Sequence, residues 1–79
     1  MNLKEKVIDM LKNLSGQPDI REEDSLANDL GIDSLGMVTL LVALEEMLSA
    51  ELEETDMDPF ALATVEDVIA LAERYAHEN

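Results

Sequence analysis

The chain contains no cysteine, so neither a disulfide bond nor a cysteine-based metal site is available to it. It also lacks any run of about 20 apolar residues, which is the length that a membrane-spanning helix needs. The first residues carry lysines among acids, without the apolar core of a signal peptide. These absences predict a cytoplasmic protein that does not insert into membranes.

Basic residues are scarce: five lysines and arginines stand against nineteen aspartates and glutamates, for a formal net charge of −14. Such a charge repels nucleic acid and anionic lipid and attracts basic protein surfaces. Disorder is one interpretation of this acidity. However, 47% of the residues are hydrophobic, and their helical spacing allows a core. We therefore expect a folded monomer that binds no nucleic acid.

The length of 79 residues predicts a single domain over residues 1–79, with one small core. A deep catalytic cleft is not expected in so short a chain. Carboxylates on exposed helices usually form a solvated face rather than an acid–base pair. We therefore predict that the protein is not an enzyme.

Helical spacing of apolar residues first appears near the N-terminus, at Leu3, Val7, Met10, Leu11 and Leu14. Asn2 and Glu5 stand three residues apart, as in an N-terminal cap, and Gly16 followed by Pro18 predicts the end of this helix. Residues 17–33 then mix proline, glycine and charges with isolated apolar residues. This composition predicts a long loop, held to the core by Ile20, Leu26, Leu30 and Ile32.

The segment from Leu35 to Leu48 is apolar at most positions and too long for an ordinary strand, so it predicts a helix. Its core stripe is expected to be Leu40, Leu41, Leu44, Met47 and Leu48. The other side consists of Leu35, Val38, Thr39, Val42, Glu45 and Glu46. An apolar outer stripe edged with acids is typical of a partner-binding helix. The alternative is that Val38 and Val42 are buried as well.

The C-terminal third predicts two further helices. Asp58 and Pro59 introduce a short one that includes Phe60, Ala61 and Leu62. Thr64 and Asp67 cap a last helix whose apolar face is Val65, Val68, Ile69, Ala72 and Tyr75. The predicted fold class is all-α. It is a small four-helix bundle of three longer helices and one short one, with a long loop between the first and second.

The segment Asp29-Leu30-Gly31-Ile32-Asp33-Ser34-Leu35 places a hydroxyl where the long loop meets the central helix. From the residues alone, the favoured interpretation of Ser34 is an N-cap of that helix. The flanking acids Asp29 and Asp33, the glycine and the apolar Leu35 argue for a functional role instead.

This segment, followed by Val38, Leu40 and Leu44-Glu45-Glu46, resembles the acyl carrier protein family, and the resemblance extends over essentially the whole chain. It implies that Ser34, with Asp33 and Leu35 beside it, is the attachment point of a covalent 4′-phosphopantetheine arm. It implies further that the arm carries acyl groups as thioesters in fatty-acid or related lipid or polyketide biosynthesis. No resident metal site is expected.

The same resemblance implies two kinds of partner. A phosphopantetheinyl transferase must activate the Ser34 hydroxyl, because the only histidine, His77, lies near the C-terminus. Synthase- and acyltransferase-type enzymes with basic patches would then contact the acids of the central helix. The apolar contacts are expected from Leu35, Val38 and Val42, with Thr39 also on this partner-binding surface, and the ionic ones from Asp33, Glu45 and Glu46.

Two observations leave alternatives open. Gly36 and Thr39 occupy places where the family often has acids, and the pattern around them is similar to that of carriers of amino acids such as D-alanine. An aminoacyl or peptidyl carrier is therefore one alternative, and a helical interaction module that is never modified is another.

Asp24-Ser25-Leu26 repeats the motif tripeptide, but Ser25 lacks the preceding Leu-Gly and is expected to be a cap or turn residue.

Overall fold

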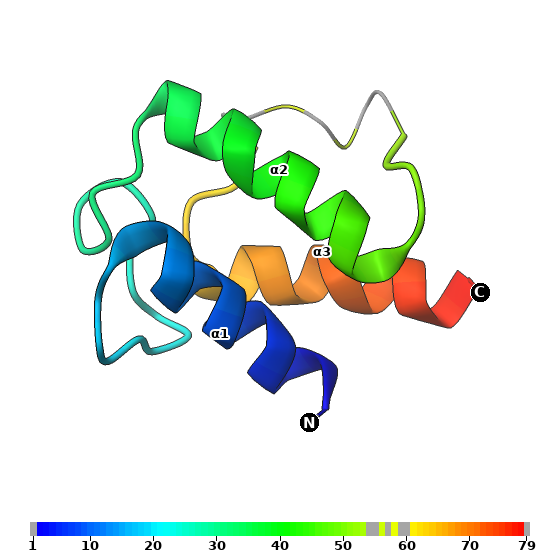
Figure 1. Ribbon diagram of the computed structural model, residues 1–79, viewed down its shortest axis with the longest axis horizontal. Helices are drawn as coiled ribbons and strands as arrows, with labels where there is room; N and C mark the ends of the chain where they lie inside the picture. The colour runs from blue at the N-terminus through cyan, green and yellow to red at the C-terminus, as the bar shows by residue number, and fades with distance from the viewer. Residues whose placement is uncertain (1, 54–55, 57, 59–60, 79) are drawn as a thin grey trace.

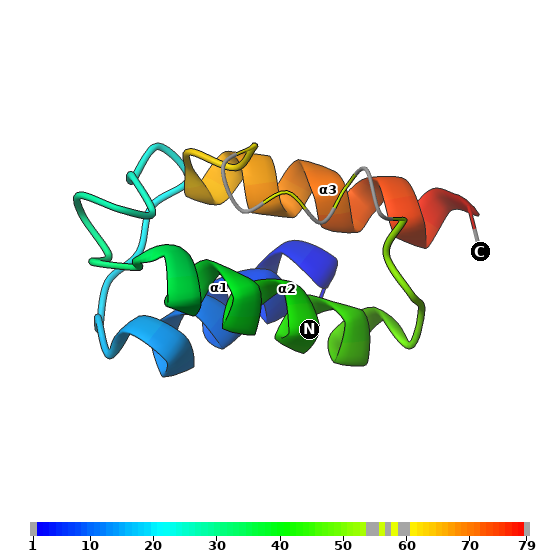
Figure 2. The ribbon, with the colours of Figure 1, turned by 90° about the horizontal axis from the view of Figure 1, so that it is seen from above.

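The computed structural model describes residues 2–53, 56, 58 and 61–78, with the side chains given up to residue 76. Three helices are present in this part of the chain: α1 (Leu3–Ser15), α2 (Ser34–Leu48) and α3 (Val65–Glu78). All three contact one another, and Figures 1 and 2 show α3 stacked against the pair formed by α1 and α2. The described residues contain no strand beyond an isolated bridge between Ser25 and Thr64, so the predicted all-α class is confirmed.

The ends of α1 follow from local sequence. The Asn2 side chain accepts a hydrogen bond from the Glu5 amide at 2.8 Å, as the spacing of these residues predicts. At the other end Gly16 adopts a left-handed conformation, with φ of 74°, and donates its N–H to the Lys12 carbonyl at 2.8 Å. Helix α1 therefore begins and ends as expected.

Residues 16–33 connect the end of α1 to the start of α2 at the same end of the molecule (Figure 1). Leu26, Leu30 and Ile32 are buried, and Ile20 packs against the core from a partly buried position. Backbone hydrogen bonds also tie this connection to the start of α3, from Leu26 to Ala63 and from Val65 to Asp24. These contacts fix the position of the segment that leads into Ser34.

The core is apolar throughout the described residues and includes the expected faces of the helices. Leu40, Leu41 and Leu44 of α2 are buried, while Met47 and Leu48 are partly buried at its end. All five predicted core residues of α3 are buried: Val65, Val68, Ile69, Ala72 and Tyr75. The structure adds Met37 and Leu71, which the sequence did not single out.

The predicted short fourth helix is not confirmed. Pro59 and Phe60 lie outside the described residues, and Ala61 and Leu62 are not helical. Leu62 instead packs against the core as part of the segment that leads into α3. Within the part of the chain that the structure describes, no helix combines the length and apolar character that crossing a bilayer requires.

Candidate functional site

Ser34 is the first residue of α2, and the residue before it caps the helix. Asp33 Oδ1 accepts a hydrogen bond from the Gly36 amide at 2.7 Å, and the Asp33 carbonyl accepts one from Met37 at 2.8 Å. The interpretation of Ser34 itself as the N-cap is therefore wrong. Its side chain is exposed, and within the described residues its hydroxyl makes no hydrogen bond. The hydroxyl is thus accessible to another protein.

The loop before Ser34 determines how the chain emerges at the surface. Gly31 has φ of 69°, a left-handed conformation that most residues adopt only with strain. The Ile32 amide then donates to the Leu26 carbonyl at 2.9 Å, and the Ile32 side chain is buried. Because Ile32 is anchored in the core, Asp33 and Ser34 follow it out to the surface.

Ser25, in the repeated tripeptide, occupies a different environment. Its hydroxyl accepts a hydrogen bond from the Asn28 amide at 3.1 Å, and its own amide donates to Asp29 Oδ2 at 2.7 Å. Ser25 is therefore a turn residue, as predicted. Asp29, one of the two acids near Ser34 in sequence, closes this turn.

Two hollows flank the start of α2. One, of about 390 Å³, lies between α2 and the segment before α3 and is lined by Ser34, Met37 and Leu62, among others. The second, of about 380 Å³, lies toward the end of α1 and is lined by Leu35, Gly36 and Thr39, with Leu14 opposite. The Ser34 side chain therefore borders one hollow directly, and a second lies on the other side of the start of α2.

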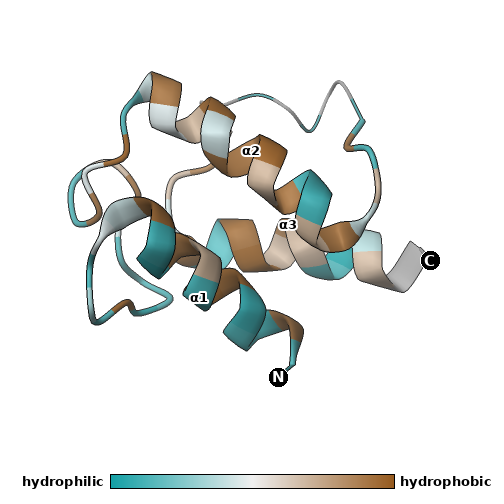
Figure 3. Cartoon of the chain, in the orientation of Figure 1, coloured by the Kyte–Doolittle hydropathy of each residue, from teal (hydrophilic) through white to brown (hydrophobic). Residues whose placement is uncertain are grey.

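The predicted outer stripe of α2 is indeed on the surface. The exposed fractions are 77% for Leu35, 47% for Val38 and 45% for Val42, so the alternative that both valines are buried is wrong. Thr39 is also exposed, and its hydroxyl donates to the Leu35 carbonyl at 3.2 Å. In Figure 3, α2 is apolar along most of its visible surface, whereas α1 shows broad hydrophilic bands. The stripe leaves apolar area available for a partner.

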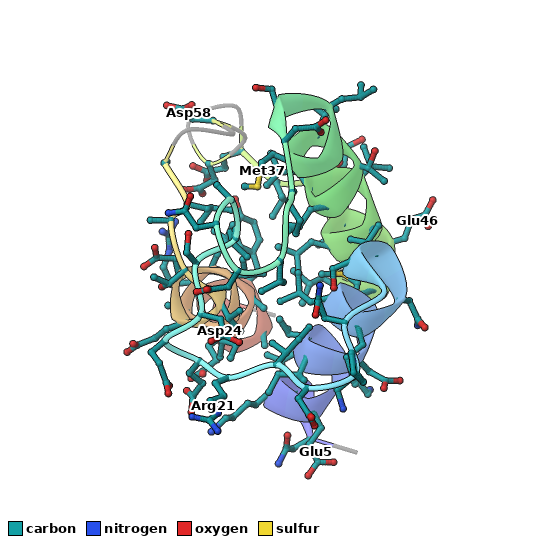
Figure 4. All side chains as sticks on the ribbon, turned by 90° about the vertical axis from the view of Figure 1, so that its left-hand side faces the viewer. Glu5, Arg21, Asp24, Met37, Glu46 and Asp58 are labelled. Carbon is teal, nitrogen blue, oxygen red and sulfur yellow. The ribbon has the colours of Figure 1, made fainter. Side chains whose placement is uncertain are left out.

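The two glutamates of the stripe differ. Glu46 is exposed, and Figure 4 shows it pointing away from the molecule, on the opposite side of α2 from Met37. Glu45 is partly buried, and its Oε2 accepts a hydrogen bond from the Leu52 amide at 3.0 Å. Glu45 thus also holds the segment that follows α2, which its position in the sequence did not indicate.

A second side-chain contact holds the same segment, and sequence reasoning missed it. The Tyr75 hydroxyl accepts from the Glu53 amide and donates to Asp56 Oδ2, both at 2.7 Å, and Arg74 contacts both Asp56 oxygens. The hydrogen bond from Tyr75, with a contribution from Arg74, holds the pKa of Asp56 below its usual value. No local pattern could reveal this contact, because its partners are 18 to 22 residues apart.

Gly36 is the other residue whose role the sequence did not show. A Cβ atom there would lie 2.9 Å from Ile32 Cγ2 and 3.2 Å from Asp33 Oδ1. Any larger side chain at this position, an acid included, would need Ile32 to move. Accordingly, the first turn of α2 contains no acidic residue.

Among the described residues, no three histidine, aspartate or glutamate side chains are grouped so as to hold a metal ion. The acids near Ser34 instead serve the backbone: Asp33 caps α2 and Asp29 closes the preceding turn.

Comparison with known proteins gives consistent results. Residues 5–72 match a family model described as "Phosphopantetheine attachment site". The chain is 36% identical over 78 residues to an acyl carrier protein of Wolinella succinogenes, with 99% of this chain and 92% of the relative covered. It is 40% identical over 73 residues to one of a Sulfurovum species, with 91% of each covered.

A solved structure of a putative acyl carrier protein from Mycobacterium tuberculosis superposes with a TM-score of 0.83 and covers 94% of this chain and 99% of its own. Its sequence identity is 23%, so this likeness supports the helical fold alone.

Proposed function

Because the chain belongs to the acyl carrier protein family, we propose that Ser34 is the residue that bears its 4′-phosphopantetheine arm. The function of the chain is that of an acyl carrier protein, and its cofactor is a covalently attached 4′-phosphopantetheine. The arm supplies a terminal thiol on which an acyl group is held as a thioester. Acyl carrier proteins are carriers rather than catalysts, and we propose that this chain likewise catalyses nothing itself.

The observation that carries the assignment is the state of the Ser34 hydroxyl. It is exposed, it makes no hydrogen bond within the described residues, and Asp33 has already taken over the capping of α2. Its modification therefore removes no internal contact. The N-terminus of α2 also favours a phosphate electrostatically, since the helix dipole is positive there.

Modification at Ser34 needs a base and an activated donor that the neighbouring residues do not supply. In the proposed step, the serine Oγ forms a bond to the phosphorus of the pantetheine phosphate. The bond from that phosphorus to the remainder of coenzyme A breaks, so that adenosine 3′,5′-bisphosphate leaves. The serine proton passes to a base of the phosphopantetheinyl transferase. The chain contributes an accessible hydroxyl on a fixed helix end.

The test is intact mass spectrometry after incubation with coenzyme A and a broad-specificity phosphopantetheinyl transferase. The protein should gain the mass of one phosphopantetheinyl group. Ser34→Ala should abolish the gain while the helical circular-dichroism spectrum is retained, and Ser25→Ala should still be modified. Modification of Ser34→Ala would move the site elsewhere, and an unchanged mass of the unaltered chain would favour an unmodified interaction module.

The surface that partners would recognise is proposed to be the outer stripe of α2. Leu35, Val38 and Val42 supply exposed apolar area, with Thr39 among them, and Asp33 and Glu46 supply exposed negative charge. Such a surface suits basic patches on the transferase and on synthase- or acyltransferase-type enzymes. Since an exposed ion pair contributes only about 0–1 kcal/mol, the encounters would be weak and salt-sensitive.

For the cargo, we propose an acyl group of fatty-acid or related lipid or polyketide biosynthesis, with an aminoacyl or peptidyl group as the alternative. The proposed location is the cytoplasm, where coenzyme A is available for the modification. The proposed oligomeric state is a monomer, since two copies each carrying a charge of −14 repel each other. Intact mass of the protein purified from its native host reports the arm and the cargo together and distinguishes the two classes of cargo.

A further inference from the structure

A groove of about 430 Å³ runs between α1 and α2, and no residue of α3 lines it. Met10 and Leu14 form its apolar wall on α1, and Ala43 and Met47 form the wall on α2. Figures 1 and 2 both show the two helices side by side along this face. It differs from the hollow between Ser34 and Leu62, which lies on the α3 side of α2.

The groove continues toward the start of α2. Leu14 lines it and also lines the 380 Å³ hollow whose α2 wall includes Gly36 and Thr39. On α2, the positions 36, 39, 43 and 47 follow one another at intervals of three or four residues, so they lie on one face of the helix. At 1.5 Å per residue, the combined groove is about 16 Å long, or about three helical turns.

Two of the strongly exposed apolar residues in the described part of the chain line this groove. Leu35 lines its hollow at the start of α2, and Leu14, with an exposed fraction of 37%, lines it along α1. Contiguous exposed apolar surface of this kind marks interaction sites in soluble proteins. The outer stripe of α2 therefore meets the groove at Leu35, and α1 supplies the opposite apolar wall through Met10 and Leu14.

The chemistry of the groove favours a helix as its occupant. Its lining is mostly apolar, and the backbone groups of α1 and α2 are bonded within each helix, so few partners remain for the amides of an extended strand. A helix satisfies its own backbone, and a ridge of its side chains can fill a groove between two other helices. The small residues Gly36 and Ala43 allow a close approach, and the flexible Met10 and Met47 can adapt to the ridge.

Charge indicates the other property of the occupant. The groove itself contains one base and one acid, Lys6 and Asp9, but the molecule as a whole has a net charge of −14. A second copy of this chain would be repelled, whereas a basic partner would be attracted. We propose that the groove between α1 and α2 docks one amphipathic helix of a partner protein, with an apolar ridge in the groove and a net positive charge.

The proposal can be tested with the full chain, unmodified and modified at Ser34, and a synthetic peptide of about three helical turns. The peptide carries one ridge of leucines and lysines elsewhere; a second peptide has serines in place of the leucines. With ¹³C-methyl methionine labelling, the leucine peptide should shift the Met10 and Met47 resonances and leave that of the buried Met37 in place. The serine peptide should shift none of them.

Matched variants separate the groove from general charge attraction. Ala43→Glu places a charge in the groove and should weaken peptide binding at least about tenfold, whereas Ala70→Glu on the exposed side of α3 should weaken it by less than about threefold. Leu14→Ser is a second groove variant that leaves α2 unchanged. Circular dichroism checks that each variant is folded. Equal effects of the two glutamates, or a shift at Met37 alone, would overturn the proposal.

An acyl chain is the competing occupant. Loading Ser34 with an octanoyl-bearing arm should leave the Met10 and Met47 resonances unchanged, because a groove open along its length would leave a flexible chain largely in water. A shift at both methionines on loading would show that the groove holds cargo and would refute the docking of a helix. The mass gain at Ser34 is measured separately, so failure here is distinguishable from failure of the attachment site.

Discussion

Gly36 shows how one missing side chain shapes the start of α2. The first turn of the helix lies against Ile32, and the distance of 2.9 Å from a Cβ at position 36 to Ile32 Cγ2 is shorter than a normal contact. Ile32 is β-branched and buried, so it cannot rotate away freely. Packing against Ile32 therefore disfavours an acid after Leu35, whichever partners the protein has.

Gly36→Ala should consequently destabilise the protein by about 1 kcal/mol. Overpacking costs about 1–3 kcal/mol, and the better helix propensity of alanine offsets at most about 1 kcal/mol of this. Chemical denaturation measures the change. In a background of Ile32→Ala, which removes Cγ2, the same substitution should no longer be costly. Additive effects of the two substitutions would contradict the contact.

Asp67 is a second residue whose contribution can be isolated. Its Oδ2 accepts hydrogen bonds from the amides of Ala63 and Thr64, at 2.9 and 3.0 Å, at the start of α3. The amide of Ala63, followed by that of Thr64, holds the pKa of Asp67 below its ordinary value of 3.8. The stabilisation by the charged form is therefore complete above pH 3.8 and is lost as the pH falls through the lower, folded-state pKa.

Asp67→Asn should lower the free energy of unfolding by about 1 kcal/mol at pH 7, as expected for loss of a charged cap. The free energies of unfolding of the two proteins, measured from pH 7 into acid, should become equal below the ordinary Asp67 pKa of 3.8. A difference that stays constant down to the acid limit would show that the charge of Asp67 does not matter.

At the scale of elements, α2 has different environments around its circumference. Its inner side is buried against α1 and α3, its face toward α1 forms the groove, and its outer stripe is exposed. A helix that is apolar nearly all round is usually fully buried. α2 is apolar on most of its circumference because it both supplies the core and presents exposed apolar side chains.

The outer stripe predicts a position-dependent charge effect on modification. Glu46→Lys should lower kcat/KM for a broad-specificity transferase by about two- to fivefold, consistent with the loss of one exposed ion pair. Glu51→Lys makes the same charge change beyond the end of α2, at an exposed position, and should have little effect. Equal reductions would mean that only net charge is sensed. The kcat/KM of each variant is measured at low and at high salt, and the difference between Glu46→Lys and Glu51→Lys should shrink at high salt.

At the scale of the whole molecule, the net charge of −14 opposes a compact fold of 79 residues. Few ion pairs offset it: the described side chains show Lys4 with Glu22 at 2.7 Å and Arg74 with Asp56 at 2.9 Å. The apolar core and the hydrogen bonds of caps and loops must therefore stabilise the fold against repulsion.

Millimolar magnesium should accordingly raise the melting temperature, because divalent cations screen and bind clustered carboxylates. Sodium chloride at matched ionic strength should give a smaller increase. A melting temperature that does not respond to either salt would refute the repulsion argument.

The sequence by itself determined the helices that local chemistry encodes. Asn2, Gly16 and the pair Thr64 and Asp67 mark ends of α1 and α3, and the periodicity of leucine and valine predicts the buried faces. The motif around Ser34 also pointed to the carrier family, because its signature is a short contiguous segment. The short helix expected around residues 60–62 was not confirmed, since propensity alone does not fix so short an element.

Only the tertiary structure decided which polar groups remain free and which apolar groups remain exposed. Asp33 rather than Ser34 caps α2, Glu45 binds the Leu52 amide, and Asp56 binds Tyr75. Leu14 fits the apolar pattern of α1 yet is exposed, as part of the wall of the groove. The contact of Asp56 with Tyr75 joins residues 19 apart, which packing brings together and no local spacing records. The choice of Asp33 over the adjacent Ser34 as the cap is local, but both residue types suit that position, so only the folded backbone settles it.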